Sequence, residues 1–319
     1  FSLLSETFSS EKRGFAGGLV HATFVIGYIA AVIIALIFEP MTFDFGFIVL
    51  EGWRICFLAA LFPIPFLIYL EFALPESTVR EDYKEAQQDI TEEKVRIVDV
   101  LRGKWLKYTL LLTLLFWLSE FAYHALADWA PTYLARIFTY ENGGDELAGK
   151  QTSNITMLVV MLIAGGVLFT TGYVSDYIGR RKAFIGCSVI GLTGSALFYW
   201  FNFIKYSTIL IVISCFILTF SFGMHGVFGV WSNETYPTRI RATATSFIFS
   251  LARGLALGAF IVGFISTSLR PADYLTNPLG HAQALAVGML MCTFAYLAML
   301  FVPMLIPETK GVDITAIKE

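Results

Sequence analysis

Apolar runs of about twenty residues, each bordered by charged positions, divide the chain into eight segments. At 1.5 Å per residue, a helix of about that length crosses the roughly 30 Å hydrocarbon core of a bilayer. The runs do not alternate apolar with polar positions as barrel strands do, and lipid offers no partner to unpaired backbone groups. The pattern therefore predicts an all-α membrane protein. We expect its spans at about residues 15–38, 55–74, 106–134, 154–174, 184–203, 207–231, 243–268 and 283–306.

Composition excludes several classes of protein. Hydrophobic residues make up 56% of the chain and charged residues 15%, against roughly 25% charged in soluble domains. The net charge of −3 and the absence of a basic domain argue against a nucleic-acid partner. The sequence contains no GxxxxGK[ST], HExxH or GxSxG motif, so we expect neither an enzyme nor a metal site nor a nucleotide-driven pump.

The distribution of Lys and Arg predicts the orientation of the spans. Sixteen lie in the loops and tail on one side, five on the other, and Arg253 lies inside a span. Since cytoplasmic loops retain positive charge, the side with sixteen is expected to be cytoplasmic. The chain would then sit in the cytoplasmic membrane as a multi-pass protein with its C-terminus in the cytoplasm.

Short motifs along the chain resemble those of the major facilitator superfamily, in the expected order and on the expected side. They are ETFSSEKRG at 6–14, GWR at 52–54, LPES at 74–77, GYVSDYIGRRKAF at 172–184, NETYPTRIRATA at 233–244 and PETKG at 307–311. The resemblance covers nearly the whole chain. It implies a helical bundle in which the eight spans correspond to helices five to twelve of twelve.

This register also implies a domain organisation. Residues 1–74 would hold the tail of helix four with helices five and six, residues 75–104 a cytoplasmic linker, and residues 105–319 the second six-helix bundle with a cytoplasmic tail. The first helices of the protein would then precede this sequence and act as a partner of the bundle.

Two charged loops on the expected cytoplasmic side are candidate gates. An acidic side chain and a basic cluster at the same depth can form charge-assisted hydrogen bonds that hold helices together in one conformation and release them in another. The alternative is that the basic residues only fix the topology. The candidate gating residues are Asp176, Gly179, Arg180 and Arg181 in one loop, and Glu234, Arg239 and Arg241 in the other.

Arg253 is the clearest charged residue within a span. A charge at the bilayer centre costs about 2.5–3.5 kcal/mol on insertion scales, so such a residue usually faces a cavity and has a function. SLARG at 250–254 resembles a pattern of organic-ion and aromatic-acid transporters in this superfamily, in which the arginine faces an anionic substrate. The alternative is an arginine paired with a helix carbonyl or with a carboxylate of the first half of the protein, which this sequence does not show.

A second set of polar residues lies in the third span. Glu120, His124 and Asp128 follow one another at intervals of four, which places them on one face of a helix. An imidazole titrates near neutral pH and burial favours the protonated carboxyl, so the stripe is a candidate proton path. Alternatively, Asp128 lies at the outer mouth and His124 is hydrogen-bonded packing. His21 and His225 are single histidines, which are more often packing residues than ligands.

Aromatic residues on the same helices could form a wall for a planar or apolar carboxylate. The candidate substrate-binding residues are Arg253, Trp117, Tyr123, Phe228 and Trp231.

These observations together predict a secondary transporter that works by alternating access. We expect symport of a small organic anion, aromatic or carboxylic, with protons, and no cofactor beyond the proton gradient. The expected partners are the small-molecule substrate and the lipid bilayer. A proton symporter of sugars or polyols and a non-transporting membrane sensor on the same scaffold are the alternatives, and import is not distinguished from export.

Overall fold

The computed structural model of the protein describes residues 7–46, 49–73, 95–314 and 317. Over this part of the chain it has eight helical segments long and apolar enough to cross a membrane. Each overlaps one of the apolar runs, so the predicted all-α membrane fold with eight spans is confirmed. The segments are Arg13–Phe38, Gly52–Ala73, Gly103–Glu141, Glu146–Ile178, Arg180–Ile204, Thr208–Thr235, Thr238–Leu269 and Pro278–Leu305.

Several of these helices extend beyond the apolar run that predicted them. α9 (Glu146–Ile178) begins well before its apolar run, and the Asp145 side chain caps it by accepting a hydrogen bond from the Ala148 N–H at 3.0 Å. Such a cap satisfies one of the orphan donors at a helix start. Hydropathy reports only the part of a helix suited to lipid, and the polar ends continue the same helix.

Most of the spans are interrupted by short breaks. Pro63, which cannot continue a helix, precedes the second piece of its span. The interrupted spans consist of α3 (Gly52–Ala59) and α4 (Ile64–Ala73), α7 (Gly103–Ala127) and α8 (Ala130–Glu141), α11 (Thr208–Ser221) and α12 (Met224–Thr235), α13 (Thr238–Gly254) and α14 (Gly258–Leu269), and α15 (Pro278–Met289), α16 (Cys292–Ala298) and η2 (Val302–Leu305). α10 (Arg180–Tyr199) continues into a π-helical turn, η1 (Trp200–Ile204).

The chain divides into two compact units, residues 1–23 with 93–319 and residues 24–92. α2 (Arg13–Phe38) begins in the first unit and continues into the second. The domain boundaries expected from the sequence stay a prediction. Of the expected linker, residues 75–94 lie outside the described residues, as does the LPES motif, and its described end contains the short helix α6 (Ile97–Val100).

The second unit contains the rest of α2, a hairpin, α3 and α4. Strands β1 (Thr42–Asp44) and β2 (Val49–Glu51) pair antiparallel, with Phe43 opposite Leu50. Gly52 follows the hairpin, and a Cβ at this position would collide with the Phe38 carbonyl. Only glycine therefore allows the end of α2 and the start of α3 to approach this closely.

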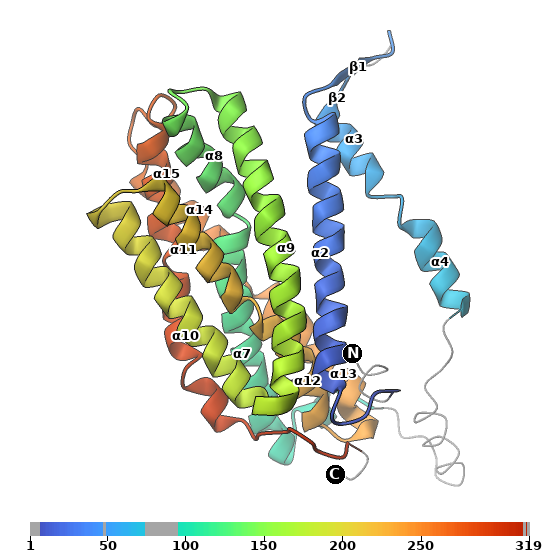
Figure 1. Ribbon diagram of the computed structural model, residues 1–319. Coiled ribbons are helices and arrows are strands. Elements are labelled where there is room, and N and C mark those ends of the chain that lie inside the picture. Colours follow the sequence, from blue (N-terminus) through green and yellow to red (C-terminus); the bar gives the residue numbers. More distant parts are fainter. Residues whose placement is uncertain (1–6, 47–48, 74–94, 315–316, 318–319) are drawn as a thin grey trace. The chain divides into compact units, whose positions relative to one another are not determined.

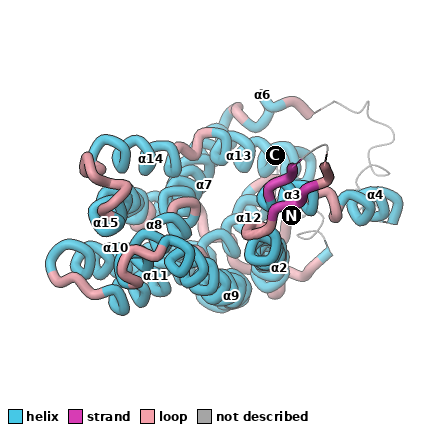
Figure 2. The backbone as a smooth tube through the Cα atoms, turned by 90° about the horizontal axis from the view of Figure 1, so that it is seen from above, coloured by secondary structure: helices cyan, strands magenta, loops and turns pink. Residues whose placement is uncertain are grey.

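In the first unit the helices from α7 onward run side by side as one bundle (Figure 1), and Figure 2 views them end-on. α8 packs along α9, α10 along α11, and both α13 and α16 along α7. Large apolar side chains such as Phe260 and Phe264 point outward and are 71% and 66% exposed. Soluble proteins rarely expose so many large apolar side chains, whereas a surface in contact with lipid requires them.

The start of α2 packs closely against this bundle through small residues. Gly14 and Gly18 are four residues apart on α2, and a Cβ on either would run into α9 near Gly172. A Cβ on Gly226 of α12 would meet the Leu168 carbonyl of α9. Glycines at this spacing let helix backbones approach within a membrane, and they bring the first turns of α2 beside α9 and α12.

Candidate functional site

A buried carboxylate on α7 is surrounded by basic groups from three helices. The Glu120 side chain is only 4% exposed. Its Oε2 lies 3.4 Å from His124 Nε2 and 3.4 Å from Arg253 Nε of α13, and its Oε1 lies 3.7 Å from His225 Nε2 of α12. We call Glu120, His124, His225 and Arg253 the Glu120 cluster. His21 of α2 is close enough to His225 and Glu120 for their charges to interact with it.

Helix breaks position the members of this cluster. His225 is the second residue of α12 and follows the break at Phe222 and Gly223, and Arg253 is in the last turn of α13. A Cβ at Gly258, where the chain resumes as α14, would collide with the Phe121 carbonyl of α7. Ends of discontinuous helices supply binding sites in many transporters because their backbone and side chains converge on a cavity.

Exposure changes stepwise along the acidic and imidazole groups of α7. The Asp128 side chain is 43% exposed and its Oδ2 lies 2.8 Å from His124 Nδ1. His124 is 26% exposed and contacts the buried Glu120 with its other ring nitrogen. The stripe expected from the sequence is thus a continuous chain of contacts from an accessible carboxylate to a buried one, and its role in proton movement stays a prediction.

Arg253 is the accessible cation of the cluster. Its side chain is 57% exposed although its Nε lies against the buried Glu120. Trp117 donates its indole N–H to the Leu255 carbonyl at 2.7 Å and so holds the break that follows Arg253. An accessible guanidinium beside a buried carboxylate can bind a second anion on the side that faces away from the carboxylate.

The predicted aromatic wall is divided between two places. The Tyr123 ring lies 5.6 Å from the His225 ring and 5.2 Å from Phe222, beside the Glu120 cluster. Phe228 is fully buried and stacks on Phe116 at 4.2 Å, in the packing between α7 and α12. Trp231 is also fully buried and donates its N–H to the Pro307 carbonyl. The structure therefore places Trp117 and Tyr123 beside the cluster and Phe228 and Trp231 in the bundle interior.

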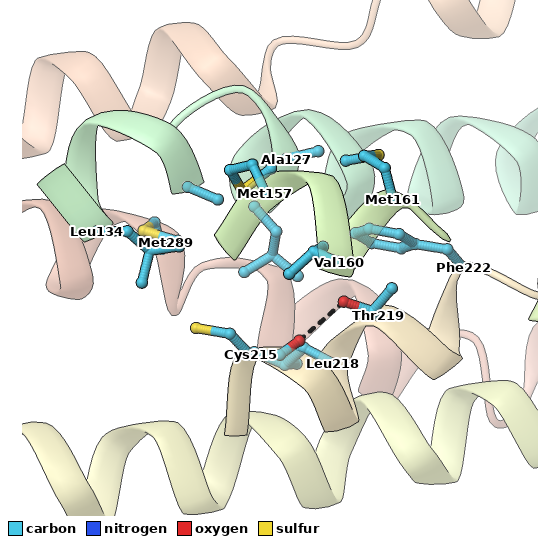
Figure 3. Close-up of a pocket in the computed structure, with 12 residues that line it drawn as sticks. Ala127, Leu134, Met157, Val160, Met161, Cys215, Leu218, Thr219, Phe222 and Met289 are labelled. Atoms are coloured by element: carbon cyan, nitrogen blue, oxygen red, sulfur yellow. Dashed lines mark hydrogen bonds between the residues drawn. The ribbon is translucent and has the colours of Figure 1, made fainter. Parts of the chain in front are cut away.

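A separate cavity lies between α7, α8, α9, α11 and α15. Its walls are almost entirely apolar, and the Thr219 hydroxyl donates its hydrogen bond to the Cys215 carbonyl at 2.9 Å (Figure 3). It therefore offers little to an anion. The lining residues are Leu126, Ala127, Ala130, Leu134, Met157, Val160, Met161, Cys215, Leu218, Thr219, Phe222 and Met289.

A second ionic group links the ends of α9, α10 and α12 to the start of α2. Arg180 Nη1 lies 2.6 Å from Asp176 Oδ1, and its Nε and Nη2 donate to both oxygens of Glu234 at 3.1 and 2.9 Å. Asp176 also accepts the Gly14 and Phe15 N–H groups at 2.9 and 2.8 Å, which caps α2. We call Arg13, Asp176, Arg180 and Glu234 the arginine–carboxylate cluster, because Arg13 Nη1 lies 3.9 Å from Glu234 Oε1.

The PETKG segment near the C-terminus closes this cluster. Gly179, with φ of 97°, turns the chain between α9 and α10 and leaves room for the Glu308 carboxylate, which accepts the Arg180 and Arg181 N–H groups. The Thr309 hydroxyl donates to Glu234 Oε2 at 2.7 Å. A carboxylate at a helix start satisfies free N–H groups and complements the helix dipole.

The remaining candidate gating residues hold other segments. Arg181 donates to the Ile306 carbonyl at 2.6 Å. Arg239 lies 3.9 Å from Asp99 of α6. Arg241 is fully buried and donates to backbone carbonyls, among them that of Ile314 in the C-terminal tail. The basic partners of Glu234 are thus Arg180 from the neighbouring loop and Arg13 from the start of α2. Arg239 and Arg241 of its own loop contact α6 and the C-terminal tail.

The turn between α12 and α13 is tied to α7 by Tyr236. Thr109 donates to the Val100 carbonyl at 2.9 Å, so the Tyr236 hydroxyl is the donor in their 2.9 Å contact. Burial raises the pKa of the Tyr236 phenol above its usual value, although the hydrogen bond with Thr109 opposes the shift. The phenol therefore stays protonated and the tie is independent of pH over the physiological range.

Comparison with known proteins identifies the family. Residues 1–261 match the family model of the Major Facilitator Superfamily. The chain belongs to the Major Facilitator Superfamily. The resemblance expected from the motifs is therefore confirmed, and so is a multi-pass membrane protein.

Three curated relatives in this superfamily show moderate similarity. A probable 4-methylmuconolactone transporter of Cupriavidus pinatubonensis is 25% identical over the whole chain and 67% of the relative. The cis,cis-muconate transport protein of Acinetobacter baylyi and the putative niacin/nicotinamide transporter NiaP of Bacillus subtilis are each 24% identical over 83% of the chain. The chain spans 60% of the length of each of these two.

A solved structure shows the same fold. The superfamily's proton:xylose symporter XylE, bound to 6-bromo-6-deoxy-D-glucose, matches with a TM-score of 0.69 at 17% identity, over 98% of this chain and 68% of that one. The family and these relatives are transporters, so the expectation that the protein is not an enzyme is confirmed.

Sequence reasoning missed three contributors. Arg13 and the Glu308–Thr309 pair lie in motifs that indicate the family but no individual role, and His225 is a single histidine. A sequence signal existed for the first two, since charged residues at the ends of spans pair across loops. His225 had none, because its partner Glu120 is more than a hundred residues away.

Proposed function

We propose that the protein is a secondary transporter that carries small organic anions together with protons by alternating access. The observation that carries the proposal is the pairing of Arg253 with Glu120, an accessible guanidinium against a buried carboxylate at 3.4 Å. Arg253 is the substrate anchor in this proposal, and Glu120 is the group that exchanges a proton.

The pair provides a reason for coupling. A substrate carboxylate that binds Arg253 competes with Glu120 for the same guanidinium. A buried carboxylate that loses its cation favours the protonated form, because burial disfavours the charged one. Substrate and proton would then bind together, and release of one would favour release of the other.

The relatives support an anionic substrate. Two of the three are named for cis,cis-muconate and for niacin with nicotinamide, and muconate and niacin are carboxylic acids. Trp117 and Tyr123 beside the cluster would suit the flat, unsaturated body of such a molecule. XylE, the proton:xylose symporter, shares the fold, and a sugar is the alternative substrate class that the experiment must separate.

In this proposal the arginine–carboxylate cluster is the gate that closes one side of the transporter. It joins the first turns of α2 to the ends of α9, α10 and α12, and its charges are almost fully buried. Such a cluster holds the helices together in one state, and opening exposes each charge to water. The excess of Lys and Arg on its side of the membrane favours a cytoplasmic location for the cluster and the C-terminus.

Uptake by the purified full-length protein in liposomes tests this function. With the outside more acidic than the inside, we expect accumulation of labelled cis,cis-muconate or nicotinate, and a protonophore should abolish it. Xylose, offered under the same conditions, should not accumulate. Accumulation of xylose with neither acid transported would favour the sugar alternative, and transport of none of the three would contradict the proposal.

A further inference from the structure

His225 faces the carboxylate of Glu120 from the start of α12. Its ring Nδ1 lies 3.1 Å from the Phe222 carbonyl, which can only accept a hydrogen bond. Nδ1 therefore carries a hydrogen, and in the neutral imidazole Nε2 is left as an acceptor. That nitrogen lies 3.7 Å from Glu120 Oε1.

The arrangement leaves two buried acceptors opposite each other. His225 Nε2 is buried without a hydrogen-bond partner in the described part of the chain, and the atom that it faces is Glu120 Oε1, which is an acceptor when the carboxyl is ionised. An ionised carboxylate facing an imidazole lone pair is unfavourable, because neither buried acceptor receives a hydrogen from the other. One proton relieves both, either as imidazolium donating to carboxylate or as carboxylic acid donating to imidazole.

The surrounding charges indicate in which state, with or without substrate, the Glu120–His225 pair takes up a proton. The groups that interact with the pair are His124 on α7, Arg253 on α13 and His21 on α2, and Asp128 in turn contacts His124. Arg253 is always charged, and it balances an ionised Glu120 while the substrate is absent. A substrate carboxylate on Arg253 adds one negative charge. A proton on the Glu120–His225 pair restores the balance.

We infer that Glu120 Oε1 and His225 Nε2 share the coupling proton, so that His225 is the proton-holding partner of Glu120. The inference rests on the proposed function for its link to transport. No bond other than those to the proton is made or broken. The proton arrives from one side of the membrane, the Asp128–His124 contacts offer a path to the pair, and it leaves on the other side with the substrate.

The matched test replaces His225 by glutamine. Its amide can donate a hydrogen bond to Glu120 but cannot take up a proton, so the variant keeps a hydrogen-bond donor at this position and loses the imidazole that would hold the coupling proton. We expect H225Q in liposomes to exchange external for internal cis,cis-muconate or nicotinate at equal pH, but to lose accumulation driven by a pH gradient. His281 lies on α15 against Tyr274, so H281Q is the control and should accumulate like wild type.

A measurement without substrate tests the shared proton independently of the proposed transport function. In a pH titration of the full-length protein by infrared spectroscopy and ¹⁵N-histidine NMR, we expect one buried carboxyl and one imidazole nitrogen to change together. In H225Q we expect the imidazole change to disappear and the carboxyl change to move to a different pH. Accumulation by H225Q at the wild-type level, or carboxyl titration unaltered by it, would overturn the inference. Failure of wild type to accumulate either acid, with the joint titration intact, would refute the proposed function alone.

Discussion

Replacement of Arg253 by alanine is expected to reduce carboxylate uptake by one to two orders of magnitude. The guanidinium is the accessible cation of the Glu120 cluster, and a hydrogen bond to a charged group is worth about 1.5–3 kcal/mol, or roughly 10- to 150-fold in affinity. The loss should be larger than for an exposed ion pair because Glu120 would also lose its cation. Initial rates of cis,cis-muconate and nicotinate uptake by the full-length protein, over a range of concentrations, measure the effect.

Two variants make this test specific. Arg253→Lys keeps the charge but not the forked donors, so it should retain part of the uptake with weaker apparent affinity. Arg136, which forms an exposed pair with Glu146 at 3.1 Å, is the control, and R136A should transport like wild type. Wild-type rates for both acids in R253A would disprove the anchoring role of Arg253.

The second large effect is expected for Arg180→Ala. This substitution removes the cation that serves both Asp176 and Glu234, and breaking a buried pair from one side costs about 3–5 kcal/mol. The closed arrangement of α2 against α9 and α12 should therefore lose most of its advantage over the open one. We expect a lower melting temperature and faster thiol labelling of a cysteine placed at Ala16, which is buried in the first turns of α2, compared with the same cysteine in otherwise wild-type protein.

The neighbouring Lys182 offers a control of the same charge. It is exposed on α10, so K182A removes one positive charge from the loop without touching the buried carboxylates. Melting and labelling should both stay at the wild-type values. An R180A protein that melts and labels like K182A would mean that the cluster does not hold the closed state.

One helix carries members of both ionic groups. His225 is the second residue of α12 and Glu234 lies nine residues later, about 14 Å along the axis. All twelve residues of α12 are buried. A movement of the helix that disturbs one group would therefore displace the other, and the proposed gate would be connected mechanically to the Glu120 cluster through α12.

The sequence predicted what depends on local patterns. Span length and apolar content predicted the eight helices, because lipid imposes both. The interval of four residues predicted that Glu120, His124 and Asp128 follow one another on α7, and the contacts between them are local in sequence. Asp176 and Arg180 are likewise four apart and in contact.

What the sequence left open depends on contacts between distant segments. The sequence placed Arg253 within a span. It did not show whether the guanidinium pairs with Glu120 or with a backbone carbonyl. The partner of Glu234 came from another loop, and the caps supplied by Asp176 and Glu308 join elements more than a hundred residues apart. The apolar run also continues across the break after α11, at Phe222 and Gly223, so the sequence did not reveal the discontinuity that positions His225.

Proton flux measured together with substrate flux tests the central claim most directly. Liposomes that contain the full-length protein and a trapped pH-sensitive dye, with the membrane potential clamped at zero, receive cis,cis-muconate or nicotinate without a pH gradient. We predict that wild type acidifies the interior as the acid enters, and that Glu120→Gln exchanges labelled acid across the membrane without acidification. Entry of the acid into wild-type liposomes without acidification, or acidification undiminished in the Glu120→Gln variant, would contradict the account.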